Sequence, residues 1–314
     1  MLYFIVNQKA RSGKGASHWQ EVCGVLREQH MEYKAWMTEY EGHAFSLVRE
    51  ICTQAKQSGD KDICLVVLGG DGTVNEVING IPDFEGVRIG ILPVGSGNDL
   101  ARGLGIKGSV TENLMRILTC MRSGKDSGYL MDLGEVRWGK DESRLFAISA
   151  GLGLDALVCK KAITSKVKVF LNRLHLGKLT YLFLTVQSLF TMETVDGGVR
   201  YDKRGNRIRK LIFIAAMNFR AEGGGVPMAP DADAADGKLS VCTAYGIPKW
   251  RTFFCLPFLV AAKHAHIHGF SVQDCAVCEV KLEGPAVLHA DGEYLGDVDR
   301  VRFSCLPGKL RVLL

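Results

Sequence analysis

The segment VLGGDGTVNEVINGI, residues 67–81, constrains the fold of this chain more than any other. The apolar run ICLVVL, residues 63–68, leads into its glycines and is typical of a strand buried on both faces of a parallel sheet. Apolar residues at helical spacing follow the glycines, and Thr73 with Glu76 matches a capping box. The segment therefore predicts a strand, a glycine loop and the first turns of a helix.

A glycine loop in this position suits an anionic ligand. Glycine lets backbone N–H groups approach a phosphate closely, and α/β folds bind anions where a strand ends and a helix begins. Asp71, between Gly70 and Gly72, would repel a phosphate unless a Mg²⁺ ion lay between the two. The alternative is a tight turn in which Asp71 bonds only its own backbone. The loop favours phosphate binding, with Asp71 acting through the metal.

The composition narrows the class of protein. A chain of 314 residues with 47% hydrophobic content predicts two domains with substantial cores. The formal net charge of +5 is mild for this length, so nucleic-acid binding is not expected. Ten scattered cysteines are typical of a reduced, cytosolic protein. No signal peptide is expected, and the longest apolar runs are too short to span a bilayer.

The order of apolar segments changes part-way along the chain. Residues 1–126 alternate strands with helices, which predicts a doubly wound, mostly parallel α/β domain, with a polar loop over residues 7–15. Residues 127–314 read as strands separated by turn residues and predict a mainly antiparallel β domain, whose last strand is free to pack back on domain one. Two helical insertions, about 154–192 and 248–268, interrupt it.

Two clusters of potential metal ligands are weak evidence for a metal site. Cys275 and Cys278 form a single C-x-x-C without a second pair, so we expect cysteines on a strand near a turn rather than a zinc site. His264, His266 and His268 alternate, and only the first and last would share a helix face. We expect a basic helix end there rather than a metal site.

Five motifs together carry a resemblance to a known family. They are NQKARSGKG (7–15), GGDGTVNEVINGI (69–81), GILPVGSGNDLARGLGI (90–106), PMAPDADAADGKL (227–239) and HADGEYLG (289–296). With them the chain resembles the soluble bacterial diacylglycerol kinases and related lipid kinases, whose catalytic domain is shared with sphingosine and ceramide kinases. The resemblance covers essentially the whole chain. One departure is Gln8, where the family usually has proline after the asparagine at position 7.

The resemblance implies an ATP site across the strand ends of the first domain. The residues that it assigns to ATP are Asn7, Ser12, Gly13, Lys14, Thr38, Gly69, Gly70, Asp71, Gly72, Thr73, Val74, Asn75, Glu76 and Ser96. Glu76 has an alternative role, since it would also complete the capping box. Lys14, Asp99 and Asp132 would form a charged network near Mg²⁺, although Asp132 also suits a turn that begins domain two.

The resemblance places the remaining chemistry in the second domain. Glu293 would be the base that accepts the proton of the lipid hydroxyl, and Asp291 would support it or the Mg²⁺. The alternative for this segment is a plain hairpin turn. A structural Mg²⁺ would be bound by the Asp236 side chain, helped by carbonyl groups near Asp233 and Lys238; the alternative is an acidic loop without metal.

These features predict an ATP- and Mg²⁺-dependent lipid kinase. It would phosphorylate the free hydroxyl of diacylglycerol and so give phosphatidic acid. The alternatives are a small-molecule kinase similar to NAD kinase and a non-catalytic nucleotide- or lipid-binding module. The insertion at residues 160–190 mixes lysines with large apolar residues and suits an anionic membrane surface. We therefore expect a cytoplasmic protein peripheral to the inner face of the membrane, compatible with a homodimer. The sequence does not specify which lipid is used.

Overall fold

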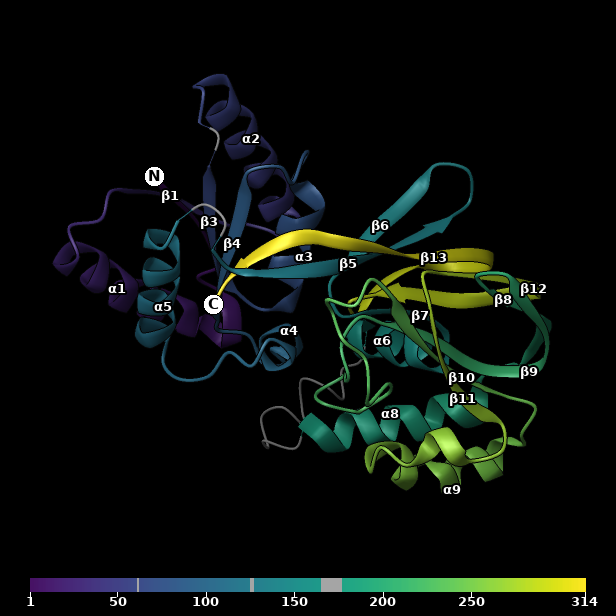
Figure 1. Cartoon of the computed structure of the whole chain (residues 1–314). Coiled ribbons are helices and arrows are strands. Elements are labelled where there is room, and N and C mark those ends of the chain that lie inside the picture. The colour runs from purple at the N-terminus through teal and green to yellow at the C-terminus, as the bar shows by residue number, and fades with distance from the viewer. Residues whose placement is uncertain (61, 125–126, 165–176) are drawn as a thin grey trace. The chain divides into compact units, whose positions relative to one another are not determined.

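The chain forms two structural units in the structure, a computed structural model that describes residues 1–60, 62–124, 127–164 and 177–314. Unit 1 comprises residues 1–132 and 307–314, and unit 2 comprises residues 133–306. The chain therefore passes between the units twice, once within β5 (Tyr129–Trp138) and once within β13 (Glu293–Leu313) (Figure 1).

Unit 1 is built on a parallel sheet. Its strands are β1 (Leu2–Val6), β2 (Tyr33–Met37), β3 (Ile63–Gly69) and β4 (Val87–Pro93). They lie in the order β2–β1–β3–β4, and the end of β13 adds a further parallel strand beside β4. Every residue of β1 and β3 is buried, which confirms the doubly buried strands expected from their apolar runs.

Helices cover both faces of this sheet. They are α1 (Ala10–Glu28), α2 (His43–Gln57), α3 (Asp71–Gly80), α4 (Asp99–Gly103) and α5 (Val110–Arg122). Helices α1 and α5 share one core with β1 and β3, in which Phe4 packs among Trp19, Leu26 and Leu114. Helices α2 and α3 pack together and contact β1 and β3 respectively. The predicted α/β domain is confirmed.

The capping box predicted at the start of α3 is wrong. The helix begins at Asp71 after Gly70, so Thr73 already lies in the first turn and Glu76 lies beyond the reach of the N-cap. The Glu76 carboxylate instead accepts hydrogen bonds from the N–H groups of Gly42 (2.9 Å) and Ala44 (3.1 Å). Gly42 is the N-cap of α2 and has no side chain, so Glu76 supplies the missing acceptor from a neighbouring helix.

The polar loop expected over residues 7–15 is also shorter than predicted. Helix α1 already begins at Ala10, although Arg11 (φ 49°) and Gly13 (φ 94°) depart from helical geometry. A Cβ atom at Gly15 would lie 2.3 Å from the carbonyl oxygen of Asn7, so glycine is required there. The glycines that suggested a flexible loop instead allow the helix to start close to the end of β1.

Unit 2 is a mainly antiparallel β structure, as predicted. Besides most of β5 and β13, its strands are β6 (Glu142–Phe146), β7 (Ser149–Gly153), β8 (Val195–Tyr201), β9 (Arg204–Met217), β10 (Leu239–Tyr245), β11 (Phe270–Cys275) and β12 (Val277–Ala290). The long strands β9 and β12 each pair with β8 along one part and with β7 along another. These four strands therefore close into a ring around an apolar core.

Helices pack on the outer face of β9 and β10. They are α6 (Leu154–Thr164), α8 (Gly177–Thr191), α9 (Lys249–Val260) and the short helix η1 (His264–His266). Phe213 and Ala215 of β9 face these helices, whereas Ile214 and Ala216 face the core inside the ring. Within the described residues, no helix has the length and apolarity that crossing a bilayer requires.

His264 and the Cys275 and Cys278 pair, considered above as potential metal ligands, are buried in unit 2. The His264 ring is fully buried, and Nε2 lies 2.9 Å from the carbonyl oxygen of Met228. Burial lowers the pKa of His264, so the expectation of a basic helix end is wrong at this residue. Cys275 and Cys278 are buried free thiols on β11 and β12, and one residue, Ala276, separates the two strands.

The Glu76→Ala variant tests the bond between α3 and α2. We expect its free energy of unfolding to fall by about 1–2 kcal/mol, because two N–H groups at a helix N-terminus lose their acceptor. Urea denaturation measures the change. Glu50→Ala is the control, since Glu50 is exposed on α2 and accepts a hydrogen bond from the Gln54 side chain at 2.8 Å; we expect a change below about 0.5 kcal/mol there. Equal effects of the two substitutions would contradict the cross-helix role of Glu76.

Candidate active site

Two glycine-containing loops of unit 1 touch at the carboxyl ends of β3 and β4. The N–H group of Val94 donates to the carbonyl of Gly69 at 3.0 Å. A Cβ atom at Gly95 would lie 2.7 Å from the Cα atom of Gly70, and one at Gly70 would lie 3.2 Å from that of Gly95. Packing therefore leaves no room for a side chain at Gly70 or Gly95, where the two loops meet. In α/β folds anionic ligands bind at this edge of the sheet.

Asp71 joins the first loop to the second. Its Oδ2 atom accepts a hydrogen bond from the N–H group of Asp99 (3.0 Å), and Oδ1 accepts one from Leu100 (3.2 Å). These donors belong to the first turn of α4, so Asp71 satisfies N–H groups of a helix other than its own. The Asp99 side chain forms an ion pair with Arg102. Asp71 is thus a brace between the loops as well as a carboxylate at the strand ends.

Several residues that the sequence assigned to ATP lie together. The Asn7 Nδ2 atom donates to Thr73 Oγ1 at 3.0 Å, and a Cβ atom at Gly69 would lie 2.7 Å from the Thr73 Cβ atom. The Thr38 N–H group donates to the carbonyl of Val6 at 2.9 Å, which aligns the ends of β1 and β2. The ends of neighbouring strands therefore meet at one edge.

Other residues assigned to ATP lie in α1, in α3 and in the loop after β4. Gly13 and Lys14 lie in the first turns of α1, where Lys14 is exposed. Ser96 is exposed in the loop after β4, and Asn75 is buried in α3. The side chain of Ser12 lies outside the described part of the chain. The nucleotide-binding roles of all these residues stay predictions.

Asp132 has a structural role that the sequence did not predict. Its buried carboxylate accepts a hydrogen bond from the N–H group of Gly308 at 2.6 Å. This bond holds the returning segment of β13 against the end of unit 1, where Arg311–Leu313 pair with Arg88–Gly90. The membership of Asp132 in a Mg²⁺ network stays a prediction.

The HADGEYLG segment forms a two-residue hairpin turn between β12 and β13. Asp291 (φ 46°) and Gly292 (φ 85°) occupy its two central positions, and Ala290 pairs with Glu293 across it. Positive φ at both positions explains the Asp-Gly sequence. The Asp291 carboxylate also accepts N–H bonds from three successive residues: Ala147 (2.8 Å), Ile148 (2.8 Å) and Ser149 (3.1 Å).

Glu293 and Arg144 form an ion pair beside this turn. The Arg144 Nη2 atom donates to Glu293 Oε2 at 2.6 Å, and the side chain of Glu293 is 33% exposed. Arg144 orients the carboxylate and competes for its lone pairs. No motif marked Arg144 in the sequence, because it lies on β6, 149 residues before its partner.

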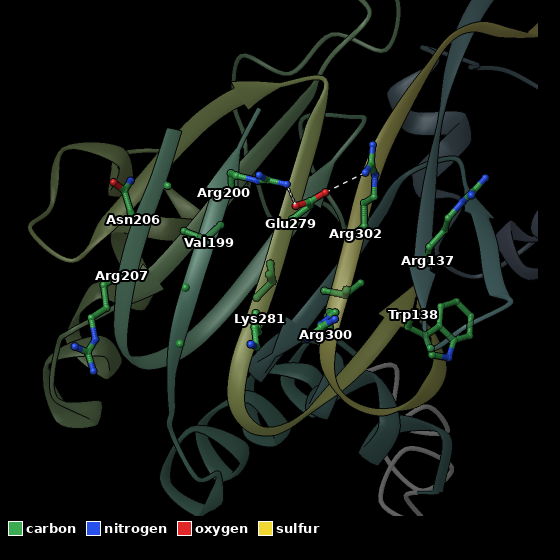
Figure 2. A pocket seen from close by; sticks show the side chains of 16 residues that line it. Arg137, Trp138, Val199, Arg200, Asn206, Arg207, Glu279, Lys281, Arg300 and Arg302 are labelled. Carbon is green, nitrogen blue, oxygen red and sulfur yellow. Dashed lines mark hydrogen bonds and ion pairs between the residues drawn. The ribbon is translucent and has the colours of Figure 1, made fainter. Parts of the chain in front are cut away.

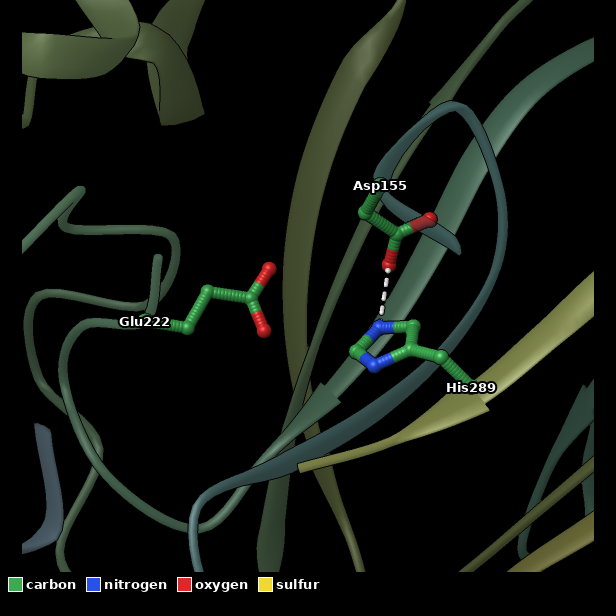
Figure 3. A group of neighbouring side chains, drawn as sticks. All are labelled: Asp155, Glu222 and His289. Atoms are coloured by element: carbon green, nitrogen blue, oxygen red, sulfur yellow. Dashed lines mark hydrogen bonds and ion pairs between the residues drawn. The ribbon is translucent and has the colours of Figure 1, made fainter. Parts of the chain in front are cut away.

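A buried histidine, His289, lies next to this turn and points toward Asp155 (Figure 3). His289 Nε2 lies 3.1 Å from Asp155 Oδ2, and the N–H group of Gly292 donates to His289 Nδ1 at 3.3 Å. Burial lowers the pKa of His289, but the bond to Asp155 and the charges of Glu222 and Asp291 outweigh it, so the pKa lies above its ordinary value. The histidine thus links the turn to Asp155 of α6.

Asp155, Glu222 and His289 are also the types of ligand that transition metals use. Their ligand atoms lie within 4.8 Å of one another, and the described residues contain no second group of three such side chains with this spacing. Ser149 Oγ donates to Glu222, which connects the cluster to the residue that bonds Asp291. The sequence offered no signal for this set, since its members come from α6, a loop and β12.

The acidic loop at residues 231–237 satisfies its own backbone. Asp233 Oδ1 accepts a hydrogen bond from the N–H group of Ala235 (3.1 Å), and Asp236 Oδ1 accepts one from Lys238 (2.9 Å). Both carboxylates are exposed. The structural Mg²⁺ expected at Asp233, Asp236 and Lys238 stays a prediction.

Comparison with known families identifies the fold and the class of enzyme. Residues 1–128 match the family described as "Diacylglycerol kinase catalytic domain", and residues 149–314 match the "YegS C-terminal NAD kinase beta sandwich-like domain". The chain belongs to the bacterial diacylglycerol kinase and lipid kinase family. The predicted family, two-part fold and lipid kinase class are therefore confirmed.

Individual relatives agree with this family. The chain is 26% identical over 312 residues to YtlR of Bacillus subtilis, whose name assigns it provisionally to the lipid kinases; the match covers 99% of this chain and 98% of YtlR. It is 25% identical over 252 residues to a diacylglycerol kinase of Mycobacterium tuberculosis, covering 79% and 76% of the two chains. A crystal structure titled as a diacylglycerol kinase of Bacillus anthracis has the same fold, with a TM-score of 0.68, 17% identity and coverage of 99% and 96%.

Proposed function

We propose that this lipid kinase transfers the γ-phosphoryl group of ATP to a free hydroxyl of diacylglycerol, with Mg²⁺. The observation that carries the proposal is the edge at which Gly70 and Gly95 meet without side chains, braced by Asp71. Phosphoryl transfer needs positioning and charge neutralisation more than covalent chemistry from the protein. An edge of this kind supplies the positioning, and a carboxylate beside it supplies a ligand for the metal.

The nucleotide site is assigned to the strand ends of unit 1. Asn7 and Thr73, which are hydrogen-bonded to each other, would lie beside the phosphates. Asp71, with Asp99 next to it, would hold Mg²⁺, which neutralises the charge on the phosphates and on the leaving group. The bonds from Asp99 and Leu100 fix the orientation of the Asp71 carboxylate before any ligand binds.

The proton acceptor is assigned to the hairpin turn of unit 2. Glu293 is preferred because Asp291 already accepts three backbone N–H bonds and would lose them by turning toward a substrate. Glu293 is partly exposed, and Arg144 holds it in one orientation. A positioned carboxylate can accept the proton of a lipid hydroxyl as the hydroxyl attacks the phosphorus atom.

A second Mg²⁺ is assigned to the loop that contains Asp233 and Asp236. Each carboxylate uses its Oδ1 atom for a local N–H bond, and the loop is rich in the oxygen ligands that Mg²⁺ prefers. This ion would stabilise the connection into β10 and would take no part in phosphoryl transfer.

The lipid is proposed to reach the enzyme from the inner face of the cytoplasmic membrane. Helix α9 exposes Trp250 (61%), Phe254 (65%) and Phe258, and the Phe253 ring lies 6.1 Å from that of Phe190 on α8. Aromatic side chains exposed together on a helix are typical of proteins that lie in a bilayer interface.

The charges around this aromatic surface support the same partner. Lys249, Arg251 and Lys263 flank the aromatic residues, and the segment from 249 to 263 contains no acidic residue. Cations next to inserted aromatic side chains favour anionic lipids. The insertion at residues 160–190, which the sequence assigned to the membrane, lies largely outside the residues whose side chains are described.

The Asp71→Asn variant tests the proposed metal ligand. We expect turnover of radiolabelled ATP with diacylglycerol in mixed micelles to be nearly abolished, because an amide is a poor ligand for Mg²⁺. Urea denaturation of the same variant separates loss of chemistry from loss of the brace. Near-normal kcat at saturating Mg²⁺ would show that Asp71 only holds the loops together. The same assay with NAD in place of the lipid tests the small-molecule alternative.

The Glu293→Gln variant tests the proposed base. Glutamine is nearly isosteric and can still accept a bond from Arg144, so the turn should survive, but its amide cannot take up the proton. We expect kcat to fall by about 10²- to 10⁴-fold, with a smaller effect on the KM for ATP. If Glu293→Gln keeps more than about a tenth of the wild-type kcat, the loss is too small for removal of a general base. Asp291 would then be the next residue to test as the base.

The double variant Trp250→Ser/Phe254→Ser tests the membrane surface. We expect its affinity for vesicles of phosphatidylcholine and phosphatidylglycerol to fall about tenfold or more, since burial of an aromatic side chain contributes about 1.5–3 kcal/mol. Co-sedimentation measures the affinity. Met115→Ser, at an exposed apolar residue of α5, is the control and should bind as the wild type does. Unchanged binding of the double variant would remove α9 from the membrane surface.

A further inference from the structure

A basic groove lies on the open face of the sheet in unit 2 (Figure 2). It has a volume of about 890 Å³ and is formed by β5, β8, β9, β12 and β13. Its charged side chains are Arg137, Arg200, Arg207, Glu279, Lys281, Arg300 and Arg302. Six cations and one carboxylate leave an excess of five positive charges, as large as the formal net charge of the whole chain (+5).

One row of side chains across the groove is paired internally. Glu279 on β12 lies directly opposite Arg200 on β8 and Arg302 on β13. Its carboxylate forms ion pairs with both, and the contact with Arg302 Nη1 is 3.0 Å (Figure 2). Opposite charges at directly facing positions stabilise a pair of strands. Each arginine of this row therefore has a carboxylate partner within the protein, and the row keeps a net charge of +1.

In the next row, two positively charged side chains face each other. Lys281 on β12 lies directly opposite Arg300 on β13, and both are exposed. On the other side Lys281 faces Gly198, which in turn faces Arg207. Among the described residues, the one ion pair of this row joins Arg207 to Glu283 at 3.8 Å, with both side chains about two-thirds exposed. Like charges that face each other directly destabilise a sheet, so this row has an unfavourable arrangement that a bound anion would relieve.

The glycine in this row leaves space between the cations. A Cβ atom at Gly198 would meet only the carbonyl oxygen of Asn206, at an ordinary distance of 3.7 Å. Neighbouring Gly197 differs, because a Cβ atom there would lie 2.4 Å from the carbonyl oxygen of Lys281. Packing therefore requires glycine at residue 197 and not at 198. At Gly198 the missing side chain keeps the floor open between Arg207 and Lys281.

We propose that this groove binds phosphate groups between Arg207, Lys281 and Arg300. Guanidinium groups bind phosphate oxygens in pairs of parallel hydrogen bonds, and an ammonium group adds a point charge. The volume of the groove lies within the range of small-ligand sites. The phosphate comes either from a free phosphate ester or polyphosphate, or from the headgroup of an anionic lipid. The site does not depend on the proposed kinase reaction.

The Arg300→Glu variant tests the site in two binding assays without ATP. One assay is calorimetric titration of the full chain with sodium pyrophosphate. The other is flotation with phosphatidylcholine vesicles, with and without phosphatidic acid. We expect Arg300→Glu to weaken binding about tenfold or more in at least one assay, because the substitution removes a charge-assisted hydrogen bond to the phosphate and places a like charge beside it. Loss in the first assay identifies a free phosphate compound, and loss in the second alone identifies a lipid headgroup.

Stability and a control variant separate a site from a general effect of charge. Arg300→Glu places a carboxylate opposite Lys281, so we expect its thermal midpoint to equal or exceed that of the wild type. Lys34→Glu makes the same charge change at an exposed residue of β2 and should bind phosphate as the wild type does. Wild-type binding by Arg300→Glu in both assays would overturn the proposal. An equal loss in Arg300→Glu and Lys34→Glu would overturn it too, since net charge alone would then explain the binding.

Discussion

Half-buried carboxylates that accept backbone N–H groups determine where the loops of this kinase lie. Asp71 holds the start of α4, Glu76 holds the start of α2, and Asp291 accepts bonds from three successive residues. Hydrogen bonds to a charged acceptor are stronger than hydrogen bonds between neutral groups. Because each carboxylate joins segments that are distant in the sequence, the two glycine loops and the hairpin turn have fixed positions without large apolar cores of their own.

This use of carboxylates explains how far the sequence could predict the site. The apolar runs and glycines around Asp71 predicted a buried strand, a loop and a helix, because those features depend on local spacing. The capping box failed because a T-x-x-E pattern does not fix where a helix begins, and the donors for Glu76 lie 34 and 32 residues earlier in the chain. Arg144 could not be predicted at all, since only the fold brings it to Glu293.

The same carboxylates impose a limit on how substitutions at the site are interpreted. Substitution of a residue that both holds a loop and contacts a ligand can reduce activity in two ways. The loop can lose its position, or the ligand can lose its contact. Asp71 and Asp291 accept backbone N–H bonds and are also proposed to act on the metal or the substrate, whereas Glu293 forms an ion pair with the side chain of Arg144. Each glycine-containing motif therefore marks a segment in which the proposed chemistry would lie. It does not distinguish the residue that reacts from the residue that holds the backbone.

The return of β13 to unit 1 has a consequence for how the protein folds during synthesis. Residues 311–313 cover the edge of β4, yet a ribosome makes them after all of unit 2. Until then the edge of β4 exposes unpaired backbone groups, and such edges are templates for aggregation. Pairing residues more than two hundred positions apart, such as Arg88 and Arg311, also slows folding, because a long loop must close first. We therefore expect the nascent chain to depend on chaperones until its last strand has left the ribosome.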